Sequence, residues 1–165
     1  MRTKGYILGI DPDVKKSGMA LLDVEARRFR FVEAYDFGEL LRTFGMLAED
    51  NGLRPLKVVV EDSWTTTHNW HLYGMSLNKA AALGRSVGLC HATGMHIITA
   101  AKLYGLDVTT MTPLKKMWKG RDGKITQQEI AAFIPDWPRT SNPEERDAAL
   151  LAWAYADLPI RIAPI

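Results

Sequence analysis

The sequence predicts an α/β fold: one domain, residues 1–165, built on a mixed five-stranded sheet flanked by helices. Two observations carry this prediction. The first third of the chain contains three apolar or alternating segments joined by short loops, which is typical of an antiparallel meander. A segment with helical spacing then leads to a wholly apolar run, and a strand–helix–strand connection of this kind makes two strands parallel. The length is enough to bury roughly 70% of the surface of the unfolded chain.

The strands of the meander are expected at Tyr6–Ile10, Gly18–Leu22 and Phe29–Tyr35. The first two are apolar, and the third alternates with the period of a strand. Phe37–Glu49 has apolar residues at helical spacing and should form the crossover helix. Leu56–Val60, which reads LKVVV, predicts a strand that is buried on both faces and parallel to a neighbour.

The middle of the chain, from Leu77 to Tyr104, has the composition of a helix, and Thr93-Gly94 could divide it into two. Ala80, Gly84 and Gly88 recur at four-residue spacing on this segment, so they share one helical face. That face either contacts a second copy of the chain or is buried inside the monomer. Leu106–Met111 predicts the fifth strand.

Two further helices are expected in the last quarter of the chain. The first covers Lys124–Phe133, and the second runs from a cap at Asn142 to about Ala156. Both begin with residues that satisfy free backbone N–H groups: Thr126 and Glu129 for the first helix, and Asn142, Pro143 and Glu145 for the second.

Composition excludes several classes of protein. The single cysteine, Cys90, rules out an intramolecular disulfide and argues against a cysteine-based zinc site. No apolar stretch reaches about 18 residues, and the N-terminus does not resemble a signal peptide, so we expect a cytoplasmic protein with no membrane contact. The net charge of +2 does not by itself indicate a nucleic-acid-binding protein.

Four carboxylates are candidates for a metal site. Asp11 and Glu61 each end a predicted strand, and the carboxyl ends of parallel neighbours meet at one edge of the sheet. Glu144 and Asp147 are three residues apart on the last helix and share a face, whereas Glu145 points elsewhere. Read singly, each could be a cap, an ion-pair member or a partner of the helix dipole. Together they suit Mg²⁺, and two such ions catalyse phosphodiester cleavage.

The segment Pro113–Lys124, PLKKMWKGRDGK, concentrates five basic residues against one acid. A solvated loop is the plain interpretation, but the embedded Trp118 favours contact with nucleic acid. The other candidate contacts are Trp64, which would stack on a base or pack in the core, and Arg85. Trp70 and Tyr73 make the segment after Glu61 aromatic. The complete set of predicted nucleic-acid contacts is Trp64, Arg85, Lys115, Lys116, Trp118, Lys119, Arg121 and Lys124.

The order of these pieces resembles the RuvC family of Holliday-junction resolvases, within the ribonuclease H-like superfamily. The pieces are LGIDP with Ser17-Gly18, Val60-Glu61 followed by Trp64, LGRSVG from Leu83, the lysines Lys116 and Lys124, and NPE…DAA from Asn142. The resemblance implies a ribonuclease H-like fold and a homodimer that cleaves branched DNA. It also implies that Asp11, Glu61, Glu144 and Asp147 hold two Mg²⁺ ions, with Mn²⁺ able to substitute, and that Lys116 and Lys124 lie beside the scissile phosphate.

The chain departs from the family pattern at Asp13, where glycine is usual, and at Glu144, where aspartate or histidine is common. The leading interpretation is a bacterial or phage-encoded, Mg²⁺-dependent crossover junction endonuclease. A nuclease acting on structured RNA and a module that binds nucleic acid without cutting it are the alternatives. An actin-like ATPase would need two such domains, which 165 residues cannot supply.

Overall fold

The computed structural model describes residues 5–65 and 74–161, and within them the sheet has five strands in the order β3-β2-β1-β4-β5. Successive pairing of β1, β2 and β3 is antiparallel, whereas β4 is parallel to both β1 and β5. The predicted combination of a meander with two parallel strands is therefore confirmed. The strands are β1 (Tyr6–Asp11), β2 (Ser17–Asp23), β3 (Arg28–Tyr35), β4 (Leu56–Glu61) and β5 (Asp107–Met111).

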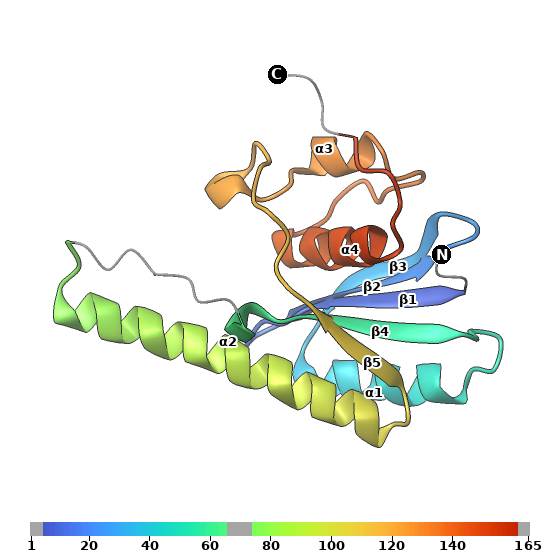
Figure 1. Cartoon of the computed structure of the whole chain (residues 1–165), viewed down its shortest axis with the longest axis horizontal. Helices are drawn as coiled ribbons and strands as arrows, with labels where there is room; N and C mark the ends of the chain where they lie inside the picture. Colours follow the sequence, from blue (N-terminus) through green and yellow to red (C-terminus); the bar gives the residue numbers. More distant parts are fainter. Residues whose placement is uncertain (1–4, 66–73, 162–165) are drawn as a thin grey trace.

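Helices cover both faces of the sheet (Figure 1). α1 (Phe37–Glu49) and α2 (Leu77–Leu103) lie on one face, and α4 (Pro143–Tyr155) lies on the other with the short α3 (Gln127–Ala131) beyond it. None of the helices in the described part of the chain has a stretch long and apolar enough to cross a membrane.

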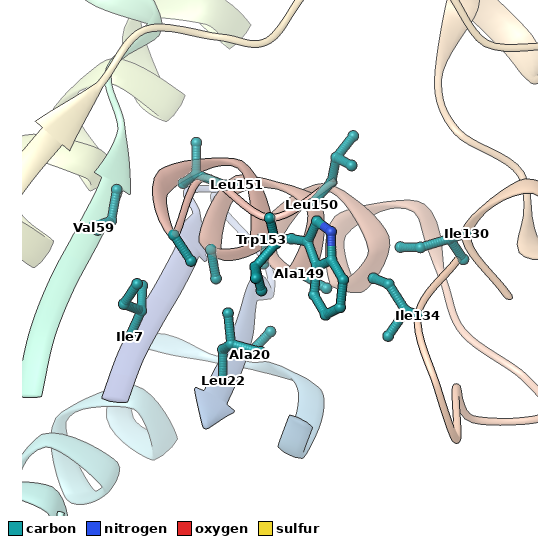
Figure 2. Close-up of a cluster of buried hydrophobic side chains, with 14 of the residues drawn as sticks. Ile7, Ala20, Leu22, Val59, Ile130, Ile134, Ala149, Leu150, Leu151 and Trp153 are labelled. Atoms are coloured by element: carbon teal, nitrogen blue, oxygen red, sulfur yellow. The ribbon is translucent and has the colours of Figure 1, made fainter. Parts of the chain in front are cut away.

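The alternation of side chains along the strands divides the core into two clusters. Ile7 packs with α4, whereas its neighbour Leu8 packs with α1 and α2. Figure 2 shows the cluster on the α4 side, where the fully buried ring of Trp153 lies among aliphatic residues from the strands and from α3. This alternation decides which side chains at the strand ends point toward α4.

α2 is one continuous helix, so the division expected at Thr93-Gly94 is wrong. Gly94 lies in the middle of α2 and is buried, because the ring of Trp64 packs directly on it. A β-carbon at Gly94 would overlap that ring. Glycine at this position serves close packing rather than helix termination. α3 also begins later than predicted, at Gln127, although its capping box of Thr126 and Glu129 is present as expected.

The N-terminal half of α2 projects beyond the sheet (Figure 1). The buried residues of this helix, Gly94, Ile97, Ala100 and Ala101, all lie in its C-terminal half. A β-carbon placed on Gly84 or Gly88 would have no described atom within 4 Å. In the part of the chain that the structure describes, Gly84 and Gly88 are exposed, so this stretch of the small-residue face is not buried there.

α4 lies unusually close to the sheet because two glycines face it. A β-carbon on Gly9 in β1 would overlap the carbonyl oxygen of Ala148, and one on Gly18 in β2 would overlap that of Glu144. Gly18 is also paired across the sheet with Asp11. The first turn of α4 thus rests on strand backbone directly beside the end of β1.

We expect Gly18→Ala to lower the free energy of unfolding by about 1–3 kcal/mol, because the added methyl group must push the start of α4 away from β2. Gly45→Ala is the matched control. Gly45 lies inside α1, where a β-carbon would make an ordinary 3.5 Å contact with Tyr104, so alanine should raise stability by roughly 0.5–1 kcal/mol. Urea denaturation measures both values. Equal effects of the two substitutions would contradict the close approach.

Candidate active site

Asp11 and Glu61 lie side by side at the carboxyl edge of the sheet. They end β1 and β4, which are parallel neighbours with Ile10 paired to Val60. Because side chains alternate along a strand, both acids share the face of Gly9 and Val59, which is the α4 face. The shared edge predicted from the sequence is therefore confirmed.

α4 brings a third carboxylate to the same place. Asp147 lines a small pocket of about 120 Å³ together with Asp11 and Glu61. Glu144 does not line this pocket, but it is close enough for its charge to raise the pKa of Asp11. Glu145 is turned away, because its carboxylate accepts hydrogen bonds from the backbone N–H and the side-chain amide of Asn142, at 2.9 and 3.1 Å.

The carboxylates destabilise one another's charged forms. Burial raises the pKa of Asp11 well above its usual value, and the negative charges of Glu61 and Asp147 raise it further. Burial, with repulsion from Asp147, raises the pKa of Glu61 to about 7. A buried group of like charges is unfavourable unless protons or cations neutralise it.

Two lysines supply part of the neutralising charge. The Nζ of Lys124 lies 2.7 Å from Oδ2 of Asp147, and both side chains are largely shielded from solvent. Burial alone would lower the pKa of Lys124, but the hydrogen bond and charge of Asp147, with Asp11 and Glu144, raise it instead. Lys116 lines the same pocket, and its charge lowers the pKa of Glu61.

The chemistry of this donor set fits a hard divalent cation. Its members offer carboxylate oxygens, the ligands that Mg²⁺ and Mn²⁺ prefer, and two of them carry a repulsion that a cation would relieve. In residues 5–65 and 74–161, no three Asp, Glu, His or Cys side chains are already arranged as a ligand set. One of the carboxylates, Asp147, is instead paired with Lys124.

Only some residues of the basic segment Pro113–Lys124 line the pocket. Lys115, Lys116, Trp118 and Lys124 line the pocket, whereas Lys119 and Arg121 do not line it and are exposed to solvent. The ring of Trp118 is stacked on Phe133, with 6.2 Å between ring centres, so it forms a fixed wall of the site. Arg85 lies elsewhere, exposed on the projecting half of α2.

Trp64 is half-buried in the short 3₁₀ turn after β4 (Ser63–Thr65). Its ring packs on Gly94 and meets His91 edge-on, with 6.3 Å between ring centres. Much of the Trp64 side chain thus packs inside the protein, as one of the two interpretations expected. Stacking of Trp64 on a base stays a prediction. Trp70 and Tyr73 lie outside the described residues.

Sequence reasoning missed Arg146, which lies between two acids in the first turn of α4. Its Nε donates a hydrogen bond of 2.9 Å to the carbonyl of Ile125, next to Lys124. The sequence does contain an indication of this role. A cation is unfavourable at the positive N-terminal end of a helix, so an arginine at that position suggests specific hydrogen-bond acceptors nearby.

We expect Glu61→Gln to stabilise the metal-free protein at pH 8 by about 1–3 kcal/mol, because the neutral amide removes the cost of burying a charge and the repulsion from Asp147. The pKa of Glu61 is about 7 in the folded protein, against an ordinary value of 4.5. The protonated Glu61 therefore does not destabilise the wild-type protein below about pH 4.5, and stability is lost as the pH rises to about 7, where the carboxyl of the folded protein ionises. The difference should therefore vanish near pH 4. Denaturation in EDTA at both pH values measures it, with the exposed Glu49→Gln as the control.

A glutamine variant less stable than wild type at pH 8 would show that the Glu61 carboxylate is held by favourable partners instead. Mg²⁺ should raise the melting temperature of the wild-type protein more than that of Glu61→Gln, because the variant has lost one donor.

Comparison with known proteins places this site in a recognised fold. A Thermus thermophilus RuvC, solved in complex with Holliday junction substrate, has a TM-score of 0.50 at 18% identity, with 92% of each chain covered. Another Thermus thermophilus RuvC structure gives 0.49 at 20% identity, covering 92% of this chain and 95% of that one. Neither protein-family models nor curated protein sequences give a match. The chain has the fold of the RuvC Holliday-junction resolvases.

Proposed function

We propose that this protein is a divalent-metal-dependent endonuclease that cleaves branched DNA, with the four-way junction as its substrate. The observation that carries the proposal is the convergence of three carboxylates and three lysines on one pocket at the carboxyl edge of the sheet. That edge belongs to a fold similar to a RuvC solved with a Holliday junction.

In this proposal Asp11, Glu61, Glu144 and Asp147 hold two Mg²⁺ ions, and Mn²⁺ can replace them. When bound, the ions supply an activated water and stabilise negative charge on the attacking and leaving oxygens of the phosphodiester. The sheet fixes the backbone of Asp11 and Glu61, whereas Asp147 has to exchange Lys124 for a cation. Lys116 and Lys124 place positive charge beside the scissile phosphate, where charge develops during cleavage.

The exposed basic residues provide affinity for the DNA backbone. Lys115, Lys119 and Arg121 lie on the loop that borders the pocket, and Arg85 lies on α2. Contacts of this type bind phosphates without reading sequence. Trp118 and the exposed part of Trp64 would stack on unpaired or distorted bases, which a branch point offers and an intact duplex does not.

A homodimer would place one site on each of two strands of a junction that is roughly two-fold symmetric. The projecting half of α2 supports a dimer, because no described residue packs on Gly84 or Gly88. Leu77 and Leu89 on the same half are exposed to 89% and 46%.

The direct test compares a labelled four-way junction with a matched duplex and an RNA hairpin, each with Mg²⁺ and with EDTA. The proposal expects cleavage of the junction alone, and only with Mg²⁺. Preferred cleavage of the hairpin would favour the nuclease for structured RNA. Tight junction binding without cleavage in Mg²⁺ or Mn²⁺ would favour a module that binds without cutting.

We expect Asp11→Asn to abolish cleavage while leaving junction binding nearly intact, because the carboxylate serves chemistry and the basic residues supply affinity. Single-turnover cleavage and a binding titration in Ca²⁺ measure the two effects. A residual rate above about a tenth of wild type, worth only ~1.4 kcal/mol of barrier, would show that Asp11 is not a ligand.

Glu144→Gln should lower the cleavage rate far more than Glu145→Gln. The first residue acts on the carboxylate group electrostatically, while the second closes the capping box on Asn142. The same assay, run on both variants, measures the ratio. Equal losses would contradict the assignment, and the reverse order would make Glu145 the ligand.

A dimer at micromolar concentration is the expected result of light scattering. Gly84→Arg should convert it to a monomer, because a long charged side chain would fill the open face of α2 and prevent a second backbone from approaching. A wild-type monomer, with and without DNA, would remove the dimer from the proposal.

A further inference from the structure

Arg146 is held by two loops, one that leads into α3 and one that leads into α4. Its Nε donates to the carbonyl of Ile125, at 2.9 Å, and its Nη1 donates to the backbone carbonyl of Ser141 and to the Ser141 hydroxyl, at 3.3 Å for the latter. The segment that contains Ile125 carries the end of the basic loop into α3, and Ser141 precedes the cap of α4. One guanidinium therefore connects the segments that enter both helices.

Two consecutive residues of α4 hold the last residue of the basic segment and the residue that follows it. Arg146 holds the backbone of Ile125, and Asp147 holds the side chain of Lys124. Lysine has a long, flexible stem, so where its ammonium group can reach depends on where its backbone is anchored. Lys124 lies outside the helices and strands, and the hydrogen bond to its neighbour's carbonyl attaches this stretch to α4.

The far side of Arg146 is equally well connected. The hydroxyl of Ser141 donates to the side-chain carbonyl of Gln127, which also accepts the indole N–H of Trp137 at 3.3 Å. The amide of Gln127 in turn donates to the carbonyl of Pro138, at 2.6 Å. Arg146 is thus fixed by a network that joins α3, the loop before α4 and α4 itself.

We propose that Arg146 is a positioning residue that anchors the backbone beside Lys124, so that the ammonium group of Lys124 reaches Asp147 in the metal-free protein and the phosphate of the substrate in the complex. The role rests on the proposed nuclease function. Lysine cannot replace arginine here, because Nε and Nη1 of the planar guanidinium reach two separate acceptors, whereas an ammonium group donates from a single atom.

The test is a double-mutant cycle of Arg146→Lys and Lys124→Ala in single-turnover junction cleavage. Arg146→Lys should slow cleavage about 10- to 100-fold, since small displacements of a catalytic group have effects of this size. In the Lys124→Ala background the same change should slow it less than about threefold. Arg139→Lys, an exposed arginine in the loop before α4, is the matched control and should be unchanged.

Equal losses from Arg146→Lys in both backgrounds would show that Arg146 does not act through Lys124, and would overturn the proposal. A wild-type rate for Arg146→Lys would overturn it as well. Circular dichroism and urea denaturation identify the folded fraction, and Arg146→Met, which keeps the aliphatic stem, serves as the second variant if Arg146→Lys does not fold.

A second readout does not depend on cleavage. In the metal-free protein the ion-paired ammonium group of Lys124 should give a slowly exchanging ¹⁵N NMR signal, assigned by its loss in Lys124→Ala. Arg146→Lys should broaden or remove this signal, and Arg139→Lys should keep it. A signal unchanged in Arg146→Lys, or missing in the wild-type protein, would overturn the positioning role. If junction cleavage itself fails, this arm still decides whether Arg146 places Lys124.

Discussion

The close approach of α4 to the backbone of β1 and β2 is the constraint on which the site depends. Gly9 and Gly18 permit it, because any side chain at either position would overlap the carbonyl groups of the helix. The helix therefore begins beside the end of β1 and brings Asp147, and the charge of Glu144, next to acids from two strands. A helix held away by ordinary side chains would leave Asp11 and Glu61 without these partners.

This convergence has an electrostatic consequence. Burial and the neighbouring carboxylates raise the pKa values of Asp11 and Glu61, and Lys124 is the cation that the described part of the chain pairs directly with Asp147. The loop that carries this lysine is itself tightly folded. Gly120 donates to the carbonyl of Lys124 at 2.9 Å, and Glu129 accepts the backbone N–H of Lys119 at 3.1 and 3.2 Å. Opposite charges are thus held close together by rigid backbone on both sides.

Much of this arrangement could be predicted from the sequence. Strand periodicity and the crossover helix predicted the order and direction of the strands. The spacing of residues on α4 predicted that Glu145 points away from Glu144, because a helix cap depends only on residues close in the sequence. Contacts between distant segments could not be predicted in the same way. Gly94 resembles a helix breaker until Trp64 is seen to pack on it, and Arg146 resembles a surface residue until its acceptors in two loops are known.

The proposed function requires that the carboxylates around Asp11 form a divalent-cation site. Anomalous diffraction from crystals soaked in Mn²⁺ tests it most directly. We expect a manganese peak between Asp11, Glu61 and Asp147, with the ammonium group of Lys124 moved away from Asp147. A map with no peak there, and with Lys124 still paired to Asp147, would contradict it.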